Sequence, residues 1–308
     1  MSATTQGKRV WYSPAVRVLS ARLAIAPATV SGTGRNGRVT RNDILAAGSR
    51  QRPAASGVEA HSRAPSPPAD DDVIPLSRIR RMTAENLMRT VREVPMARVY
   101  TTVDWTALIA TRTAMRAAFE AEQGVPLTYM PFILRGMVIA VRAHPRVNSR
   151  WTADGPLLLP ALNLGVAVST DDGLQVPVVH HAEDLSLVGL ARALHRVIMA
   201  ARENRLTITD IQGGTITVTN PGPFGTVRSA PIIPPGQSAI LSVDGVREVP
   251  VALDGTLTIR PVATLGLTYD PRLCDDSDAV LFLTILQAWL EIGVERESKS
   301  SSHRSVTA

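Results

Sequence analysis

A run of 25 residues, Gly48–Asp72, divides the chain into a short N-terminal part and a long C-terminal part. The run is rich in alanine, proline and serine, and it has almost no large apolar side chain that a core could bury. A flexible coil of this length spans roughly 28 Å root-mean-square, and its prolines would lengthen it. We therefore expect a small module tethered to a larger body, with His61 of the linker in solvent.

Positive charge is concentrated in the first 50 residues. They contain eight lysines and arginines against Asp43 alone, whereas the formal net charge of the whole chain is only +6. A basic module joined to a nearly neutral body favours an acidic partner, either a protein or a nucleic acid. The single cysteine excludes an intrachain disulfide and fits a reducing compartment. No secretory signal or membrane span is visible, so we expect a cytoplasmic protein without membrane contact.

Residues 13–47 predict a miniature helical domain, preceded by a tail over residues 1–12. Ser13 and Pro14 form a typical helix start, and apolar residues follow at helical spacing, namely Val16, Leu19 and Leu23. Thr40 is expected to cap a second helix. The glycine-rich loop between the helices, Gly32–Gly37, matches the spacing of a dinucleotide-binding fingerprint. That fingerprint needs a preceding strand, whereas a helix precedes this loop. We therefore expect that the glycines are present because a tight loop needs residues that allow positive φ. A nucleotide site is the alternative explanation.

The body, residues 73–293, is expected to mix helices and strands without a strict βαβ alternation, which predicts a mixed α/β fold. Helices are predicted over residues 78–90, 105–122, 129–143, an amphipathic segment that follows a Ser186 cap, and 279–292. Strands are predicted over residues 99–103, 157–160, 162–169, 173–179, 213–220, 239–243, 256–260 and 265–269. The last helix is apolar nearly all round, so we expect it to be buried or to lie at a subunit contact. Residues 294–308 form a polar tail.

The small module carries Ser-Pro-Ala-Val-Arg followed by Gly-Thr-Gly-x-x-Gly-Arg-Val-Thr-x-x-Asp. With this pattern it resembles, over Tyr12–Ala47, the peripheral subunit-binding domain of 2-oxo acid dehydrogenase complexes. It implies an all-α domain that docks the dihydrolipoamide dehydrogenase or the 2-oxo acid dehydrogenase subunit. Arg17 and Arg38 match the family's docking arginines, Arg41 lies where another cation is usual, and Asp43 matches a buried aspartate that organises the loop. The alternative for each arginine is a solvated surface charge.

The body contains six motifs with a defined order, namely Ile74-Pro-Leu-Ser-x-x-Arg-Arg, His144-Pro-x-Val-Asn148, Asn163-Leu-Gly-Val-Ala-Val, Gly173-Leu-x-Val-Pro-Val, Thr219-Asn-Pro-Gly and Pro231-Ile-Ile-x-Pro-x-Gln-Ser-Ala-Ile-Leu. With these motifs the body resembles the catalytic core of the dihydrolipoamide acyltransferases. The resemblance implies a chloramphenicol acetyltransferase-like fold and a trimer with active sites between subunits, built into a larger cage. It also implies coenzyme A and a dihydrolipoyl group as ligands. Because no lipoyl domain is visible, we expect another chain to supply the lipoyl group.

Acyl transfer between two thiols needs a base for the attacking thiol, a donor for the oxyanion and a channel that joins the two thiols. The resemblance implies that Thr219 is the oxyanion donor, contributed by a neighbouring subunit. In this family the base is the histidine of Asp-His-Arg-x-x-Asp-Gly, and here Pro271 occupies its position. Asp275 matches the second polar residue of that motif, and Asp276 replaces its glycine. Asp270 and Arg272 are kept and are expected to form an ion pair.

Proline has neither a titratable side chain nor an N–H group, so Pro271 cannot act as the base. Loss of a general base typically costs about 10²–10⁴ in rate. A second departure from the family is Pro95-Met96, where Pro-His is often found. Both departures favour impaired catalysis.

Other residues are weak candidates for a replacement base. Asp275 is more readily explained as a partner of backbone or an arginine, and Cys274 as a buried small side chain. The alternatives at His180-His181 are a base or a metal pair, although neighbours on an extended chain point to opposite sides. His195 is expected at the surface, and no further metal-ligand spacing is present.

Two hypotheses follow. In the first, the chain is a binding and scaffold component that docks a partner enzyme and forms an oligomeric core, with impaired or absent catalysis. In the second, it is a working acyltransferase that moves an acyl group between dihydrolipoyl and coenzyme A with a displaced base. A basic nucleic-acid-binding regulator is a third alternative, disfavoured by the lack of aromatic platforms for base stacking.

Overall fold

The computed structural model describes residue 12 and residues 14–34, 37–51, 75–171 and 173–294. The chain forms two compact units, residues 1–74 and 75–308, and each is described by itself. Residues 48–51 of the expected linker 48–72 are helical, so its expected start at residue 48 is wrong. The rest of the linker and most of the expected tails 1–12 and 294–308 lie outside the described residues.

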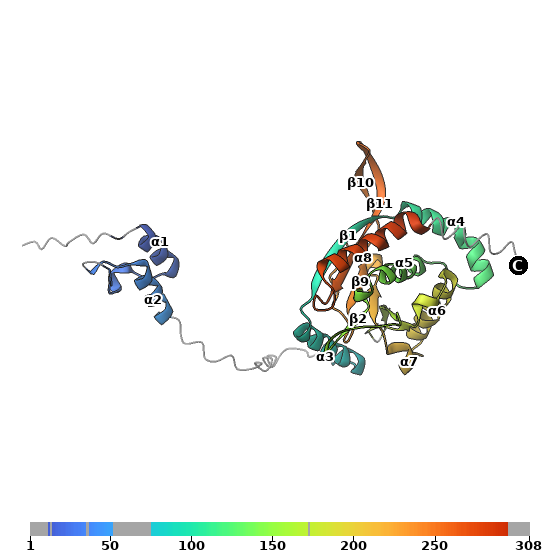
Figure 1. The fold of residues 1–308 in the computed structure, drawn as a ribbon, viewed down its shortest axis with the longest axis horizontal. Coiled ribbons are helices and arrows are strands. Elements are labelled where there is room, and N and C mark those ends of the chain that lie inside the picture. Colours follow the sequence, from blue (N-terminus) through green and yellow to red (C-terminus); the bar gives the residue numbers. More distant parts are fainter. Residues whose placement is uncertain (1–11, 13, 35–36, 52–74, 172, 295–308) are drawn as a thin grey trace, which may run out of the picture. The chain divides into compact units, whose positions relative to one another are not determined.

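The small unit consists of two helices joined by a tight loop (Figure 1), as the sequence predicts. Helix α1 spans Pro14–Leu23, a 3₁₀ turn spans Pro27–Thr29, and α2 spans Arg41–Gln51. Its core is formed by three nearly inaccessible side chains, Val16, Ile25 and Ile44. The loop closes where Gly34 pairs with Arg38, and a Cβ on Gly34 would lie 2.7 Å from the Arg38 carbonyl oxygen. Gly37 has φ of 71°, so the expectation of a positive φ is confirmed there. At Gly34 the expectation is wrong, because its φ is not positive and the close approach of the Arg38 backbone requires the glycine instead.

The body is built on a seven-stranded sheet. Its strands follow the order β1-β11-β9-β8-β4-β7, and β10 pairs with β11 beside β9. The bounds are β1 Ala97–Asp104, β4 Leu164–Val166, β7 Val178–Val179, β8 Ile216–Thr219, β9 Ala239–Val243, β10 Arg247–Leu253 and β11 Thr256–Tyr269. Strand β8 runs parallel to β4 and β9, whereas the other pairs are antiparallel. Two small hairpins lie apart from this sheet: β2 Ser149–Thr152 with β3 Gly155–Leu158, and β5 Val168–Thr170 with β6 Gly173–Gln175.

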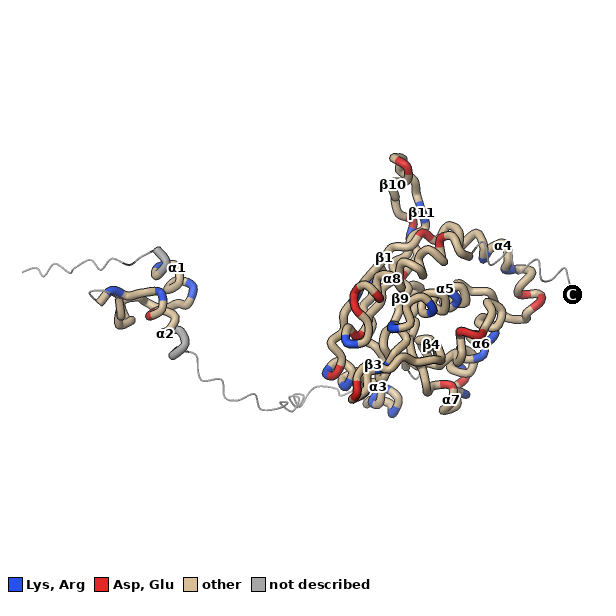
Figure 2. The backbone as a smooth tube through the Cα atoms, in the orientation of Figure 1, with Lys and Arg blue, Asp and Glu red and all other residues tan. Residues whose placement is uncertain are grey.

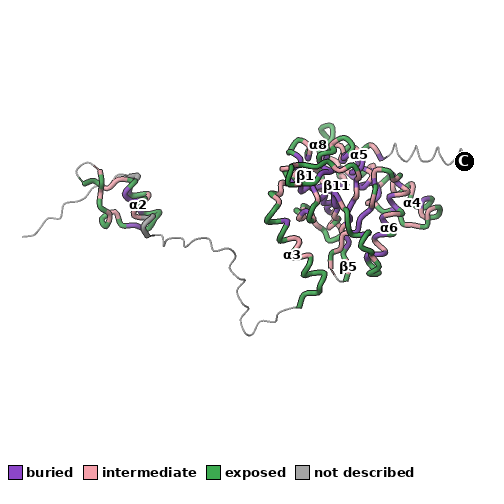
Figure 3. Tube along the Cα trace, turned by 60° about the horizontal axis from the view of Figure 1, so that its bottom comes forward, coloured by how far each residue is buried: buried purple, intermediate pink, exposed green. Residues whose placement is uncertain are grey.

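Helices α5, α6 and α8 pack together against this sheet, and the hairpin of β10 and β11 projects from the body (Figure 1). The helices of the body are α3 Arg78–Glu93, α4 Thr106–Gln123, α5 Met130–Ala143, α6 Leu187–Arg202, α7 Ile208–Ile211 and α8 Asp276–Ala288. Helix α5 lies deepest, because nine of its residues are buried. The buried residues gather in the middle of the body (Figure 3) and form one core with contributions from the sheet and the helices. Among the described residues, no helix has the length and hydrophobicity that crossing a bilayer requires.

The mixed α/β class expected from the sequence is confirmed. The predicted helix caps are also confirmed: Ser77 Oγ accepts a hydrogen bond from Arg80 N at 3.2 Å, and Ser186 Oγ accepts one from Gly189 N at 3.2 Å. Several strand predictions are wrong. Segments 256–260 and 265–269 form one 14-residue strand, because β1, β9 and β10 together pair along its length.

Other element boundaries differ from those expected. The predicted strand over 173–179 divides into β6 and β7, which pair with β5 and β4 respectively. The last helix begins at Asp276 rather than Ala279 and passes into a π-helical turn, Trp289–Gly293. Its apolar residues are not all buried, since Val280 and Leu281 are 48% and 47% exposed. Strands β2 and β10 and helix α7 were not expected.

Candidate functional site

The turn that follows β11 carries most of the residues expected at the site. Asp270 is only 2% exposed, and Arg272 binds it with two parallel hydrogen bonds, Nε to Oδ1 at 2.9 Å and Nη2 to Oδ2 at 2.7 Å. The Arg272 backbone N–H donates to the same Oδ1 at 3.0 Å. The hydrogen bond to Asp270 raises the pKa of Arg272 above its usual value. The expected ion pair is therefore confirmed. Its two partners flank a single residue, so the pair fixes the backbone on both sides of that residue.

That intervening residue is Pro271, which is exposed to solvent. Asp275, four residues later, caps helix α8, because its Oδ1 accepts a hydrogen bond from Asp278 N at 2.9 Å. This is the backbone interaction that the sequence favoured for Asp275. Asp276 accepts a hydrogen bond from the Tyr269 hydroxyl. Burial and this bond raise the pKa of Tyr269 well above its ordinary value, so the phenol remains neutral.

Cys274 lies beneath the turn and is 1% exposed. Burial raises the pKa of its thiol to about 12, and the carboxylates of Asp278 and Asp270 act in the same direction. A thiol in this setting has almost no thiolate at neutral pH and no access to a substrate. The interpretation of Cys274 as a buried small side chain is therefore confirmed, and the nucleophile alternative is wrong.

Thr219 ends strand β8 and lies opposite Ser242 of β9, which in turn lies opposite Gly266 of β11. Tyr269 is three residues further along β11 and two strands away from Thr219. A strand rises about 3.3 Å per residue, and neighbouring strands lie about 4.8 Å apart. Three residues along the strand and two strand spacings across the sheet therefore place Thr219 roughly 14 Å from Tyr269 at the end of β11. The fold of one chain therefore does not bring Thr219 and Pro271 together.

His144 is a residue near this turn that the sequence did not mark as a base. It lies at the C-terminal end of α5, and its Nδ1 is 3.7 Å from Asp278 Oδ1. The side chains of the pair are 19% and 20% exposed. The motif that contains His144 was visible in the sequence. Its carboxylate partner was not, because it lies on α8, more than a hundred residues away.

The other described histidines lie on or beside α6 and α7. His180 Nε2 is 2.8 Å from the carbonyl oxygen of Thr209, and His181 Nδ1 is 3.5 Å from Glu183 Oε1. His181, Glu183 and Asp184 place three ligand atoms within 4.8 Å of one another, and two of these residues are exposed. His195 is half-buried on α6, so its expected surface position is only partly correct. The polar partners of His180 and His181 thus belong to the α6 and α7 region rather than to the turn after β11.

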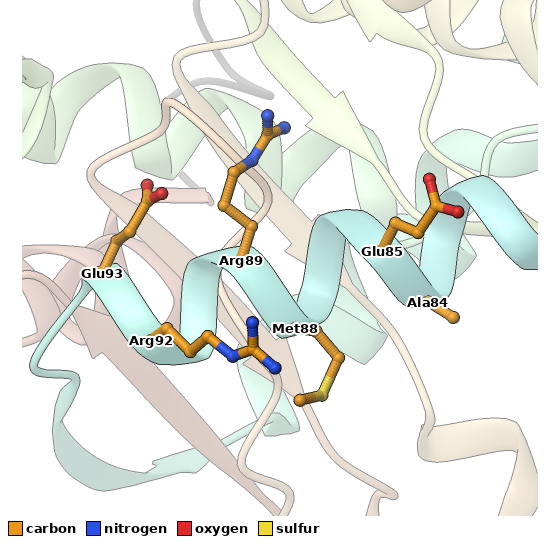
Figure 4. A pocket seen from close by; sticks show the side chains of 6 residues that line it. All are labelled: Ala84, Glu85, Met88, Arg89, Arg92 and Glu93. Atoms are coloured by element: carbon orange, nitrogen blue, oxygen red, sulfur yellow. The ribbon is translucent and has the colours of Figure 1, made fainter. Parts of the chain in front are cut away.

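The described part of the body has hollows on its surface, of which two are relevant to the site. One, of about 370 Å³, adjoins the turn and is lined in part by Arg150, Trp151, Gln237 and Arg272. The Arg272 guanidinium lies 4.8 Å from the centre of the Trp151 ring, so a cation and an aromatic face form its wall. The other, of about 470 Å³, is lined by six residues of α3: Ala84, Glu85, Met88, Arg89, Arg92 and Glu93 (Figure 4). It contains none of the expected site residues.

Arginines lie on both helices of the small unit and beside its loop (Figure 2). Arg17 on α1, Arg38 after the loop and Arg41 at the start of α2 are all exposed. The loop between them is organised by Asp43, which accepts hydrogen bonds from the backbone N–H and the hydroxyl of both Thr33 and Thr40 at 2.7–3.0 Å. These hydrogen bonds lower the pKa of Asp43 far below its usual range. The expected role of Asp43 is confirmed, since it is 8% exposed and joins both ends of the loop.

Comparison with known proteins agrees with this architecture. A family model described as 2-oxoacid dehydrogenases acyltransferase (catalytic domain) matches residues 68–295, and an e3 binding domain model matches residues 10–45. The dihydrolipoyllysine-residue succinyltransferase component of the 2-oxoglutarate dehydrogenase complex of Pseudomonas aeruginosa is 35% identical over 287 residues. The match covers 91% of this chain and 70% of that relative.

Two solved structures resemble the body at a TM-score of 0.70 and 30% identity, over 74% of this chain and 97% of each of those chains. One is the cubic core of the pyruvate dehydrogenase multienzyme complex. The other is the dihydrolipoamide acetyltransferase of Azotobacter vinelandii, studied for the role of one serine, one histidine and one asparagine in its catalytic mechanism. That histidine follows the serine by 52 positions and precedes the asparagine by 4. Taken together, the two family models and the body's fold show that this chain belongs to the 2-oxoacid dehydrogenase acyltransferase family and carries an e3 binding domain.

Proposed function

We propose that this chain is an acyltransferase-type component of a 2-oxo acid dehydrogenase complex whose acyl transfer is weakened at one position. Residues 13–47 dock a partner enzyme, residues 52–72, which follow the end of α2, tether this module, and residues 73–293 form the core. The transferred group moves between coenzyme A and a dihydrolipoyl group carried by another chain. The protein works in the cytoplasm. The presence of Pro271 where a base is required, between Asp270 and Arg272 that remain paired, carries the proposal.

The frame supports this assignment of positions. Thr219, Pro271 and Asp275 have the same separations, 52 and 4 positions, as the serine, histidine and asparagine of the Azotobacter acetyltransferase. Pro271 therefore corresponds to the histidine, Thr219 to the serine and Asp275 to the asparagine. The Asp270–Arg272 pair that flanks Pro271 is formed. The turn therefore keeps its ion pair, but its residue 271 cannot take a proton from a thiol.

The separation of Thr219 from Pro271 supports an assembled site. Because roughly 14 Å lies between Thr219 and the end of β11 in one chain, a Thr219 donor must come from a second copy. The cubic core of the related pyruvate dehydrogenase complex provides a precedent for assembly. We propose a trimer as the minimal unit, with larger cages built from it. The hollow beside Arg272 and Trp151 adjoins the turn and would receive part of a thioester substrate.

The small unit supports docking of dihydrolipoamide dehydrogenase. Arg17, Arg38 and Arg41 are exposed on a unit whose loop is fixed by Asp43, so their backbone positions are set before a partner binds. Fixed cations favour fast, salt-sensitive association with an acidic surface. A nucleic acid would satisfy the same charges, and it is the competing outcome of the docking experiment.

The transfer proposal is tested by measuring acetyl transfer from acetyl-CoA to dihydrolipoamide for the native chain and for Pro271→His. The variant should be faster by about 10²–10⁴, because it restores a general base in a preformed turn. Pro271→Gln serves as the matched control, since it removes the proline without adding a base. Equal rates for the native chain and Pro271→His would overturn the proposed weakening.

The docking proposal is tested by titrating the native chain with dihydrolipoamide dehydrogenase at low and at high salt. Arg38→Ala and Arg17→Ala should each weaken the complex, whereas Arg22→Ala, which removes another exposed cation from α1, should have little effect. Duplex DNA is titrated in parallel. Tighter binding to DNA than to the dehydrogenase would instead support a nucleic-acid partner.

A second candidate function is a fully working acyltransferase with a displaced base. One observation favours it: His144 lies next to a carboxylate at the first turn of α8, the helix that begins directly after the turn. In that case the native chain would transfer acyl groups at a rate close to that of Pro271→His.

A further inference from the structure

The position of His144 is fixed by the backbone. Its N–H donates to the Ala140 carbonyl oxygen at 2.9 Å and ends helix α5, and Pro145 then begins a 3₁₀ turn, Pro145–Val147. The imidazole is not sealed in the core, since its side chain is 19% exposed. A histidine held in this way can exchange a proton with a bound molecule without a change in the fold.

Asp278 lies beside the imidazole. Its Oδ1 is 3.7 Å from His144 Nδ1, which is within ion-pair distance but too long for a hydrogen bond. A carboxylate on this side favours the tautomer with the proton on Nδ1, which leaves the Nε2 lone pair available to accept a proton. Among the described residues, Nε2 has no hydrogen-bond partner. An imidazole oriented by a carboxylate, with its second nitrogen open, is the usual arrangement of a general base.

Two connections place this pair beside the turn after β11. Asp278 N donates to Asp275 Oδ1 at 2.9 Å, so Asp278 belongs to the same cap as the last residue of the turn. On the other side, the Ser238 hydroxyl donates to the Val147 carbonyl oxygen, and the Ser238 carbonyl accepts from Asp270 N at 3.0 Å. The segment that begins at His144 is therefore joined to both ends of the turn that contains Pro271.

We propose that His144, oriented by Asp278, is the general base for the acyl transfer that this chain performs. Nε2 takes the proton of the attacking dihydrolipoyl or coenzyme A thiol. The thiolate sulfur attacks the carbonyl carbon of the acyl thioester, which forms a new carbon–sulfur bond and an oxyanion. When the intermediate collapses, the original carbon–sulfur bond breaks and the leaving sulfur receives the proton from the His144 imidazolium. Asp278 is a positioning residue, because it acts through His144.

This inference rests on the proposed function, with His144 as the source of the slow transfer that remains without a histidine at position 271, and it is tested by the same transfer assay. His144→Ala should lower the transfer rate of the native chain by about 10² or more, and added imidazole should restore part of it. His144→Gln leaves less room for imidazole, so it should be equally slow and should recover less. Asp278→Asn should lower kcat with little change in KM. His195→Ala, which removes a half-buried histidine of α6, should leave the rate unchanged.

Failure of the His144 proposal can be distinguished from failure of the proposed function. The double variant His144→Ala, Pro271→His should transfer as fast as Pro271→His alone, which shows that the loss of His144 does not disturb the fold. If the native rate equals that of His144→Ala, or if imidazole restores nothing, His144 is not the base and the proposed function stands. If Pro271→His gains no rate and the chain docks no dehydrogenase, the proposed function itself fails.

Discussion

Arg272 holds the buried carboxylate of Asp270 with two parallel hydrogen bonds, while its guanidinium lies over the ring of Trp151. Arg272→Ala would leave Asp270, at 2% exposure, without its charged partner. Loss of one member of a buried pair costs about 3–5 kcal/mol, so the free energy of unfolding should fall by about that amount. Guanidinium denaturation at fixed protein concentration measures it. The free energy of unfolding of Arg272→Lys should lie between those of the native chain and Arg272→Ala, because lysine cannot form both hydrogen bonds. A loss below about 1 kcal/mol would contradict this role.

The separation of Thr219 from Pro271 predicts complementation between chains. In the Pro271→His background, Thr219→Ala should lower the acetyl-transfer rate by about 10²–10³, the usual effect of losing one oxyanion donor. Thr219→Ser should retain most of the rate because it keeps the hydroxyl. When the slow double variant is co-assembled with the native chain, the histidine introduced at position 271 of one chain can meet a native Thr219 of its neighbour.

Mixed assemblies of that double variant and the native chain should therefore be faster than either protein assembled alone. The measurement is the transfer rate across a series of mixing ratios, after the assemblies are dissociated and reformed. Rates that are a simple average of the two pure proteins would show that both groups act within one chain.

Asp43 makes the small unit sensitive to acid. Its folded pKa is lowered by hydrogen bonds from Thr40 and Thr33, whereas the unfolded value is about 3.9. A group with a lowered folded pKa stabilises the fold above its unfolded pKa, and this stabilisation is lost as the pH falls below it. Calorimetry of the full chain should show the small-unit transition moving to lower temperature as the pH falls from about 5 to about 3. Asp43→Asn should lower that transition at neutral pH and reduce its dependence on pH.

Cys274 should be unreactive in the folded protein. Because its pKa is about 12 and it is 1% exposed, alkylation at mildly alkaline pH should be far slower than for a free thiol and should become fast in denaturant. Mass spectrometry after timed exposure to iodoacetamide measures this. Cys274→Ser should leave the transfer rate of the Pro271→His variant nearly unchanged, and a large loss of rate would show that the thiol takes part in the chemistry.

Local patterns in the sequence determined several features of the protein. The caps at Ser77 and Ser186, the strand at β9 and the loop organised by Asp43 all depend on neighbours within a few residues, which a sequence displays directly. The replacement of an expected histidine by Pro271 is likewise a matter of sequence alone. The ion pair of Asp270 with Arg272 was predictable because the partners are two residues apart.

The tertiary structure decided what depends on distant partners. Strand β11 is continuous because β1, β9 and β10 pair along it, although its sequence suggests two strands. The contact of His144 with Asp278 joins α5 to α8, and the register from β8 through β9 to β11 sets Thr219 apart from Pro271. The sequence thus determined which chemical groups are present and which is missing. The fold decided which of them meet, because long-range pairing and packing bring together residues that no local pattern connects.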